Sequence, residues 1–589
     1  MRRILLGVLA TIGGLALLFC LVALVIGLVS WAGKGGVPSK TVLEADFEQE
    51  FVEYVPEDPV ARAILGKTPV VRDVVEALER AADDDRVVAF VAKIGGGGPG
   101  LAQAQEIRDA VLAFRAKGKR AVAWSETFGE FGPGNVGYYL ATAFDEIDLQ
   151  PSGDVGLTGL MAESPFLRGT LDKLGVVPRM DHRKEFKNAM NVFTETKYTD
   201  AHREATDKLI QSMFGQMVAG IAKGRKLSET EVRALFDRGP FLGKEAKDAK
   251  LVDALAYRDE VVAKEKERAG ARAKLLYLST YLDRAGRPHE SGTTVALIYG
   301  VGGVGRGESG YSPLFGGASM GSDTVTAAFR AAIEDKDVKA ILFRVDSPGG
   351  SYVASDSIYR ETLRAKEAKK PVIVSMGDVA GSGGYFVAMA ADKIVAEPGT
   401  ITASIGVLGG KMLTKGLWDK VGLSWDEVHT SAPSTMWSAI HDYSPQEWSK
   451  FEQWLDRVYD DFTGKVAAGR KLPREKVLEI AKGRIWTGED AKRLGLVDEL
   501  GGFPEALKLV RQAAGLSVDA KLRLKVFPKP RSTFDLLLER GRESSEAQAA
   551  TELLIRAVRA SGPLGPALRA TGLLGRRGVL EIPEMEGPR

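Results

Sequence analysis

The chain has 589 residues, with 80 Lys+Arg against 78 Asp+Glu and a formal net charge of +2. This length predicts several hydrophobic cores, and 44% hydrophobic with 27% charged residues is the composition of a folded protein. A nearly neutral chain has no basic field, which argues against nucleic acid as the main partner. The single cysteine excludes an internal disulfide framework and a Cys-rich metal site, and we expect no cofactor and no metal.

The N-terminus is long and apolar. Residues 4–32 contain 29 consecutive residues without a charge, enough for a helix rising ~1.5 Å per residue to cross a hydrocarbon core of ~30 Å. Two arginines precede this segment, which favours a cytoplasmic N-terminus. We therefore expect residues 1–36 to form one uncleaved anchor in the inner (cell) membrane, with the rest of the chain on the extracytoplasmic, periplasmic side. A signal peptide cleaved after residues 30–32 is the alternative.

The rest of the sequence contains an internal repeat. Three pairs of similar segments reveal it, at offsets of 251, 247 and 245 residues: Ala82–Val91 with Ile333–Leu342, Leu171–Val176 with Trp418–Leu423, and Gly224–Leu227 with Gly469–Leu472. An offset that drifts so little indicates a duplicated domain. We place the N-terminal repeat at 42–268, a linker at 269–292, the C-terminal repeat at 293–515 and a partly helical tail at 516–589.

Both copies show the same succession of predicted elements. Val87–Ile94 and Val338–Val345 are short, rich in apolar residues and carry few charges, which is typical of buried parallel strands. Each run precedes a segment with helical spacing of its apolar residues and then a further apolar strand. Alternation of strands and helices predicts an α/β fold with largely parallel sheets in each copy.

Two glycine-rich turns of the second copy follow apolar strands. The first is Asp346-Ser347-Pro348-Gly349-Gly350, and the second is Gly381-Ser382-Gly383-Gly384-Tyr385. Ligand sites of open α/β folds collect at the carboxyl ends of strands. A serine between glycines at a strand-to-helix turn can expose its Oγ, and glycine lets a backbone N–H approach a ligand closely. Two such N–H groups could form an oxyanion hole for acyl transfer, whereas two ordinary tight turns are the alternative.

A nucleophilic serine also needs a base. Five histidines are available, and none falls in a recognisable triad context: His182, His202, His289, His429 and His441. A lysine is the other candidate, because Ser–Lys pairs are a known variant of the catalytic triad. Such a lysine must have its pKa lowered from ~10.4 by desolvation or by cationic neighbours.

Three segments of the second copy together resemble the signal peptide peptidase A family, also called protease IV, in its long, duplicated, membrane-anchored form. They are Ser347-Pro348-Gly349-Gly350, Ser375-Met376-Gly377 with Ser382-Gly383-Gly384-Tyr385, and Thr402-Ala403-Ser404-Ile405-Gly406-Val407. The resemblance covers roughly residues 42–515 and implies two copies of the ββα superhelix of Clp proteases and crotonases. It also implies a Ser/Lys dyad, with the serine from the C-terminal copy and the lysine from the N-terminal copy. Asp346 departs from the family, which more often has Asn there.

The repeat offset tests whether the serine and the lysine come from different copies. Subtracting 247 from Ser382 gives Asn135, and adding 247 to Lys187 gives Ser434, so each copy lacks one of the two groups. Lys187 is preferred over its neighbour Lys184 because it matches the lysine position of the family. Only a site assembled from both copies would be complete.

The resemblance assigns the roles. Ser382 is the expected nucleophile, and Lys187 is the expected general base and then acid. The backbone N–H groups of Gly350 and Gly383 are expected to hold the oxyanion, with Gly349 as a further candidate, and Ser404 is expected to support the lysine.

The leading hypothesis is therefore a membrane-anchored serine endopeptidase that hydrolyses short apolar peptides, namely remnant signal peptides. By resemblance we also expect a homo-oligomer, a tetramer. The alternatives are a crotonase-like acyl-CoA enzyme and a non-catalytic membrane scaffold that retains the fold.

Overall fold

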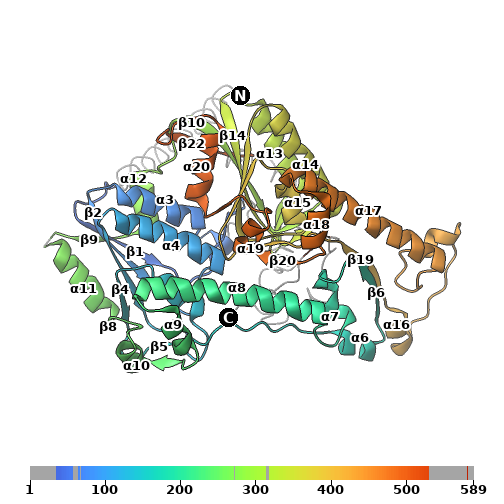
Figure 1. The fold of residues 1–589 in the computed structure, drawn as a ribbon, viewed down its shortest axis with the longest axis horizontal. Coiled ribbons are helices and arrows are strands. Elements are labelled where there is room, and N and C mark those ends of the chain that lie inside the picture. The colour runs from blue at the N-terminus through green and yellow to red at the C-terminus, as the bar shows by residue number, and fades with distance from the viewer. Residues whose placement is uncertain are drawn as a thin grey trace, which may run out of the picture.

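The structure is a computed structural model that describes residues 35–56, 61, 64–66, 68–270, 272–312, 317–528 and 580–581. Residues 1–34 of the predicted anchor and residues 529–579 and 582–589 of the predicted tail lie outside these ranges. Within the described ranges, no helix is long and apolar enough to cross a membrane. The described chain forms two similar halves, one coloured blue to green and the other yellow to orange (Figure 1).

The first half is built on a six-stranded sheet in the order β8-β4-β3-β2-β1-β9, and all five pairings are parallel. Successive residues of β2 face opposite sides: Phe90 packs with the main core, whereas Val91 packs with Val261 of α11. Burial on both faces explains the apolar strand sequences. The strands are β1 (Thr41–Asp46), β2 (Val87–Lys93), β3 (Arg120–Ser125), β4 (Glu146–Leu149), β8 (Ala254–Leu255) and β9 (Lys274–Tyr277).

The second half repeats this arrangement. Its sheet has the order β20-β18-β16-β14-β10-β22; β17 also pairs with β16, and β21 pairs with β17. Phe343 packs in one core, and its neighbour Leu342 packs with Leu507 of α20 on the opposite face. The strands are β10 (Thr293–Val301), β14 (Val338–Ser347), β16 (Val372–Gly381), β17 (Lys393–Ala396), β18 (Ile401–Ala403), β20 (Ile485–Thr487), β21 (Glu499–Leu500) and β22 (Leu522–Phe527).

The helices correspond between the halves in order and in length. Both α8 (Asp200–Arg225) and α17 (Pro445–Arg470) have 26 residues, and each ends at a lysine in the left-handed conformation. The tandem α/β duplication predicted from the repeat is therefore confirmed, whereas the likeness to the ββα superhelix stays a prediction. The other paired helices are α3 (Val71–Ala82) with α13 (Ser322–Glu334), α4 (Leu101–Ala116) with α14 (Tyr352–Glu367), α5 (Asn135–Ala141) with α15 (Gly383–Ala388), α6 (Arg168–Leu174) with α16 (Lys415–Lys420), α9 (Glu229–Phe236) with α18 (Arg474–Ile480), α10 (Gly243–Asp248) with α19 (Gly488–Arg493), and α11 (Arg258–Ala269) with α20 (Phe503–Ala513).

The structure extends both repeats beyond the predicted boundaries. β9 and α12 (Leu278–Ala285) fall in the predicted linker, yet β9 pairs with β1, and Tyr281 and Leu282 of α12 are buried in the first core. β22 lies past residue 515, yet it pairs with β10 along six residues. These elements follow turn-rich or charged sequence, which is why the repeat signal ends before them. In each half this last strand completes one edge of the sheet.

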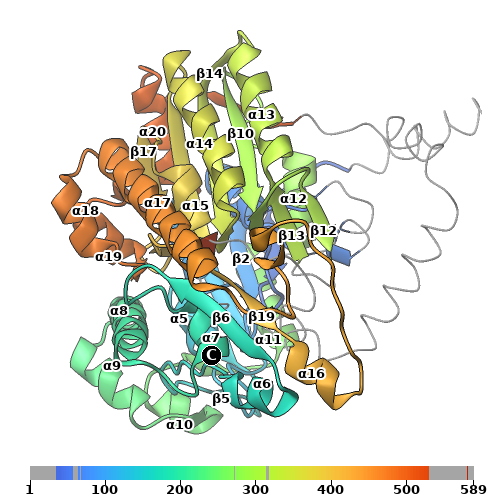
Figure 2. The ribbon, with the colours of Figure 1, turned by 90° about the vertical axis from the view of Figure 1, so that its right-hand side faces the viewer.

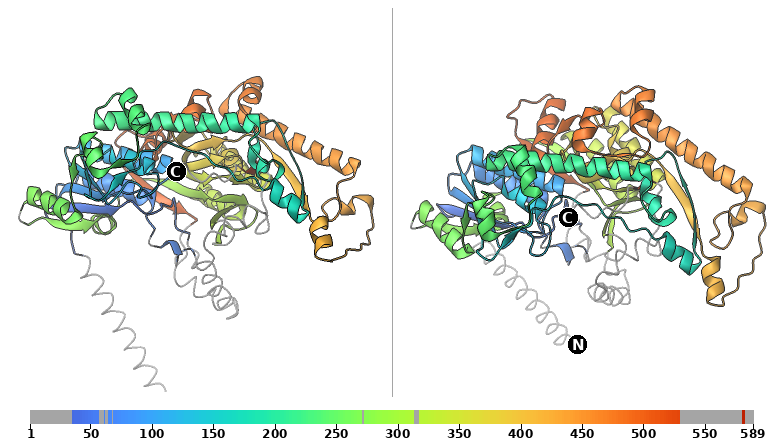
Figure 3. Two further views of the ribbon diagram at one scale, coloured as in Figure 1. Left: turned by 90° about the horizontal axis from the view of Figure 1, so that it is seen from below. Right: turned by 60° about the horizontal axis from the view of Figure 1, so that its bottom comes forward.

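An antiparallel ribbon joins the two halves. β6 (Val177–His182) of the first half pairs with β19 (Leu408–Leu413) of the second, with Leu408 opposite His182 (Figure 2). The ribbon continues into α6 and α16, which project together from the body (Figure 3). The remaining short elements are β5 (Asp154–Val155), η1 (Asn188–Met190), α7 (Asn191–Thr194), β7 (Phe241–Leu242), β11 (Gly303–Gly305), β12 (Gly310–Ser312), β13 (Gly317–Gly321), β15 (Gly349–Gly350), η2 (Ala432–Thr435) and β23 (Leu580–Glu581).

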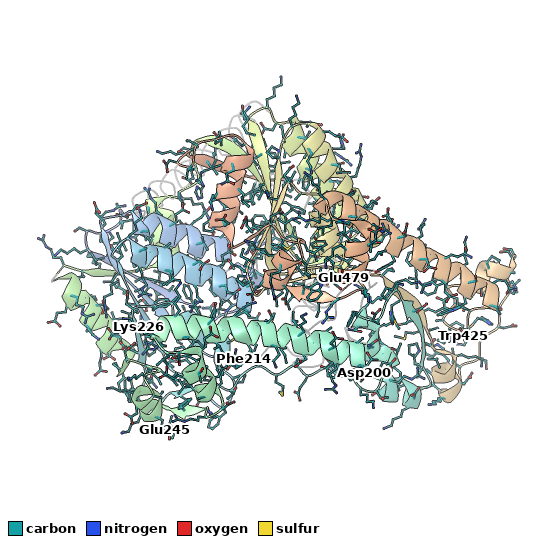
Figure 4. The ribbon with its side chains drawn as sticks, viewed as in Figure 1. Asp200, Phe214, Lys226, Glu245, Trp425 and Glu479 are labelled. Atoms are coloured by element: carbon teal, nitrogen blue, oxygen red, sulfur yellow. The ribbon has the colours of Figure 1, made fainter. Side chains whose placement is uncertain are left out.

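Helix α8 also lies along both halves. Asp200 and Lys226, labelled in Figure 4, lie at its two ends. Its C-terminal part packs in the first core through Val218 and Ile221, whereas Ser212 Oγ lies 2.9 Å from Thr487 Oγ1 of the second half. A helix is a stiff connector, so α8 fixes the spacing of the halves along its axis.

A buried ion cluster fastens the halves near their centre. The guanidinium group of Arg344 on β14 donates to Glu53 Oε2 at 2.8 Å and to Glu106 Oε2 at 2.7 Å, both from the first half. All three side chains are at most 3% exposed. Glu106 also accepts a hydrogen bond from the backbone N–H of Phe503 at 2.6 Å. Removing one member of such a cluster strands its partners as buried charges.

The ion cluster yields a stability prediction. Arg344→Leu leaves Glu53 and Glu106 buried without their cation, and we expect the free energy of unfolding to fall by about 3–5 kcal/mol. The matched control is Arg360→Leu, because Arg360 pairs with Glu367 on the surface, where both side chains are more than half exposed. That substitution should cost about 0–1 kcal/mol. Denaturant unfolding compares the two variants, and equal losses would contradict a stabilising role for the cluster.

Candidate active site

Ser382 lies in the turn between β16 and α15, as the glycine-rich sequence predicts. Its backbone has φ 54° and ψ −115°, and a positive φ is uncommon for a residue with a side chain. The backbone N–H of Ser382 donates to the carbonyl oxygen of Ala403 at 2.7 Å, which holds the strained turn in place. The side chain is fully buried. A strained serine at a strand-to-helix turn is the local geometry of a nucleophile elbow.

The first half delivers Lys187 to this turn. The chain leaves β6, and the N–H groups of Arg183 and Phe186 donate to the carbonyl oxygens of Val407 (2.9 Å) and Lys482 (3.1 Å) in the second half. Lys187 itself is 1% exposed. Backbone hydrogen bonds across the interface thus carry this segment into the other copy.

The amine and the hydroxyl meet within one chain. Lys187 Nζ lies 2.7 Å from Ser382 Oγ, 3.0 Å from Ser404 Oγ and 3.2 Å from the carbonyl oxygen of Ser404. Ser404 follows β18 and has a φ of 51°, next to Ala403 with a φ of 65°. The structure therefore brings together the predicted serine, lysine and supporting serine, which the sequence separates by up to 217 residues. A hydroxyl bonded to a buried amine is the arrangement of an activated nucleophile.

The glycines predicted for the oxyanion hole also lie together. A Cβ added to Gly383 would lie 2.9 Å from the backbone nitrogen of Gly350 and 3.1 Å from the Cα of Gly349. The N–H of Gly349 donates to Ser347 Oγ at 3.2 Å, so this group is engaged within its own turn. Gly350 and Gly383 are therefore the better-placed pair beside Ser382, and the close approach explains why no side chain fits at Gly383.

Sequence reasoning missed several residues that shape the site. Ser347 donates to the carbonyl oxygen of Gly302 at 2.7 Å as well as accepting from Gly349, which anchors the glycine turn. Gly483 and Gly406 pack against the lysine stem, so that a Cβ on Gly483 would lie 2.5 Å from Lys187 Cβ. Ser347 belongs to the Ser347-Pro348-Gly349-Gly350 motif, which signalled its importance. Gly483 lies in a turn that matches no motif, and only the fold reveals its role.

The histidines lie away from the nucleophile's hydrogen bonds. His202 shares a small pocket with the candidate base, because it lines that pocket together with Lys187, Asn188, Thr206 and Ser404. Burial lowers the pKa of His202 to about 4, so its ring is neutral near pH 7. The pocket beside Lys187 is therefore uncharged at the position of His202.

Asn135 is the counterpart of Ser382 in the first copy. Its side-chain amide binds the backbone of residues 158–159.

Packing at Gly483 yields a prediction about the lysine. Gly483→Ala should displace Lys187 and lower the rate at which a serine-directed acylating probe labels Ser382 by roughly tenfold or more, because small misplacements of a catalytic group are costly. Gly118→Ala is the matched control: its φ of 78° equals that of Gly483 (79°) within a degree, but an added Cβ meets nothing within 4 Å. Both variants force alanine into the left-handed region, which costs stability, and Gly483→Ala should lose more than the control because only its Cβ meets Lys187. Equal labelling of the two variants would show that Gly483 does not set the lysine position.

Comparison with known proteins places the chain in a family. The model of peptidase family S49 matches residues 113–272 and 364–517, one segment in each half. "Protease 4" of Salmonella typhi is 33% identical over 482 residues, covering 79% of this chain and 75% of that protein. "Serine protease SPPA, chloroplastic" of Arabidopsis thaliana is 30% identical over 471 residues, covering 79% and 68% respectively. "Putative signal peptide peptidase SppA" of Enterococcus faecium is 32% identical over 210 residues, covering 36% of this chain and 61% of that protein.

These matches extend over both halves, and they favour the peptidase hypothesis over an acyl-CoA enzyme or a scaffold. The duplicated chain belongs to peptidase family S49 and is a serine peptidase.

Proposed function

We propose that the protein is a membrane-anchored endopeptidase in which Ser382 and Lys187 form a Ser/Lys catalytic dyad. The observation that carries this proposal is the 2.7 Å contact between Lys187 Nζ and Ser382 Oγ at a site where both side chains are buried. An amine acts as a base only when it is uncharged, and burial in a low dielectric favours the uncharged form of a lysine. The surrounding protein thus supports the protonation state that the reaction needs.

The proposed reaction has two steps. Ser382 Oγ attacks the peptide carbonyl while its proton passes to Lys187 Nζ, and the resulting ammonium group then protonates the leaving amine. Water next attacks the acyl-serine ester, giving its proton to Lys187, and the serine oxygen leaves with that proton. Ser404 orients the amine through two oxygens, one from its side chain and one from its backbone.

The N–H groups of Gly350 and Gly383 are the proposed oxyanion donors. Each such donor contributes about 2.7–4 kcal/mol in acyl-transfer enzymes where one has been removed. β15, formed by Gly349–Gly350, also pairs antiparallel with β23, so its edge accepts an extended backbone. An extended peptide substrate would bind by the same backbone pairing.

The proposed substrates are short apolar peptides, in particular remnant signal peptides. A fully buried nucleophile favours unfolded, narrow substrates over folded proteins, because a folded domain cannot reach it. The relative from Enterococcus faecium is named as a signal peptide peptidase, which points to the same substrate class. The uncharged N-terminal segment over residues 4–32 supports an anchor in the inner membrane, with the catalytic halves on the periplasmic side. We further propose a homo-oligomer, a tetramer.

The dyad is tested by removing each member. Ser382→Ala and Lys187→Met should each lower kcat by about 10³-fold or more, because both groups act in the same step. The matched control is Asn135→Ala, at the position of the first copy that corresponds to Ser382. It should keep kcat within about twofold even if it lowers stability through its lost hydrogen bonds. Retained turnover in either dyad variant would reject the mechanism. A large loss of kcat in the control would mean that the nucleophile has been assigned to the wrong copy.

The substrate class is tested by competition. Purified full-length protein in detergent is given an equimolar mixture of a synthetic signal peptide and a folded, charged domain of similar mass, and mass spectrometry follows both. We expect cleavage of the apolar peptide at least about tenfold faster, since the folded domain would have to unfold to reach the nucleophile. Equal rates would contradict selection for short apolar chains while leaving the dyad intact.

A further inference from the structure

Asp346 lies on β14 at the start of the glycine-rich turn, beside the part of β16 that precedes the turn of Ser382. β14 and β16 are paired in register at Val345 and Met376, and pairing resumes at Ser347 and Ala380. One residue on β14 therefore faces three residues on β16, which is a bulge. Asp346 is the first residue of the glycine-rich turn, and Ser382 follows the bulge on the other strand.

The carboxyl group of Asp346 bridges this bulge. Its Oδ1 accepts a hydrogen bond from the backbone N–H of Val379 at 2.9 Å, which replaces a bond that the interrupted ladder cannot make. The backbone carbonyl of Asp346 accepts from the N–H of Gly302 at 2.8 Å. A Cβ added to Gly377 would lie 3.0 Å from the same Oδ1, so the bulge is packed tightly around the carboxyl. One side chain thus ties the strand before Gly350 to the strand before Ser382.

The environment of this carboxyl is crowded with acids. The nearest cation, Arg344, already donates to Glu53, Glu106 and Ser375. Asp378 of the bulge accepts from the N–H groups of Ala102 and Gln103 at the start of α4. The titratable and charged groups around Asp346 are Glu53 after β1, Glu106 on α4, Tyr299 on β10, Arg344 on β14 and Asp378 on β16.

Acids therefore outnumber cations in this cluster. Burial, followed by the negative charges of Glu53 and Asp378, raises the pKa of Asp346 to about 8. Burial likewise raises the pKa of Asp378 to about 6. Near pH 7, Asp346 is accordingly the more protonated of the two aspartates, and its Oδ1 can still accept the Val379 bond.

We propose that Asp346 is a positioning residue that works as a neutral carboxylic acid, fixing the oxyanion turn against the nucleophile turn. Ionisation of Asp346 places a negative charge four residues before Gly350. Negative charge also develops on the substrate oxygen that the N–H of Gly350 is proposed to hold, so the two charges repel each other and acyl transfer slows. The inference rests on the proposed Ser/Lys mechanism, to which it adds a second titrating group. Loss of the Asp346 proton lowers activity on the alkaline side, whereas loss of the lysine proton raises activity.

Asp346→Asn separates charge from geometry. The amide keeps an oxygen acceptor for the N–H of Val379 but has no proton to lose. We expect kcat/KM of this variant to stay within about twofold of wild type at pH 6.5. At pH 9.5 it should exceed wild type about thirtyfold, since a one-proton limb falls tenfold per pH unit beyond its pKa, here about 8. The ratio of variant to wild type cancels the lysine limb that both share. Asp346→Ala, which loses both the ionisable group and the acceptor, should lie about tenfold below Asp346→Asn at both pH values.

Asp378→Asn is the matched control, because it removes a neighbouring charge without touching the proposed bridge. Without that charge Asp346 ionises more readily, so the alkaline limb should move to lower pH in this variant. The proposal is overturned if Asp346→Asn keeps the alkaline limb of wild type, or if Asp346→Ala matches Asp346→Asn at every pH. Ser382→Ala is assayed in parallel, and turnover in that variant would reject the dyad itself. If Ser382→Ala is inactive and the pH profile of Asp346→Asn equals that of wild type, only the role of Asp346 is rejected.

Discussion

The contact between an amine of one copy and a hydroxyl of the other depends on a rigid interface between two halves that are each folded around their own cores. A lysine stem is flexible, and its entropy of ordering opposes any single geometry. Here the segment before Lys187 is hydrogen bonded to the second half at Arg183 and Phe186, and Gly483 leaves room for the stem. The interface therefore fixes the backbone, so that the side chain has little freedom left to lose.

That interface is polar where it is most buried. Arg344 binds two glutamates of the first half, and Asp378 of the second half accepts two N–H groups from the start of α4. Buried ion pairs contribute little net stability compared with apolar contacts, but a wrong alignment would leave each charge unpaired. Such a cluster selects one alignment of the halves. It also raises the local density of acid groups next to the catalytic turns, so that alignment and chemistry share the same residues.

Features of the fold and the site that depend on neighbouring residues could be predicted from the sequence more readily than features that depend on distant ones. Strands such as Val338–Ser347 are rich in apolar residues, and glycine-serine turns mark their ends, so the α/β pattern, Ser382 and the glycine turns could be predicted. Lys187 emerged from the repeat offset and a family resemblance, because nothing in its immediate sequence distinguishes it from Lys184.

Other features depend on contacts between distant segments. The β6–β19 ribbon pairs residues about 230 positions apart, and its strands carry charged and glycine residues that do not signal a sheet. The edge strands β9 and β22 follow breaks in the repeat, which hid their membership of the two sheets. Gly483 is one glycine among 67, and its importance comes from the lysine packed against it.

The separation of 195 positions between Lys187 and Ser382 has a consequence during synthesis of the chain. The ribosome completes the lysine-bearing copy first, and the serine-bearing copy emerges and folds afterwards. If Ser382 and Lys187 form the proposed dyad, a nascent polypeptide that carries only the first copy has no hydroxyl for the amine to activate, and a fragment of the second copy has no base. Under the proposed mechanism, peptidase activity therefore requires that the second copy has been synthesised and has folded against the first.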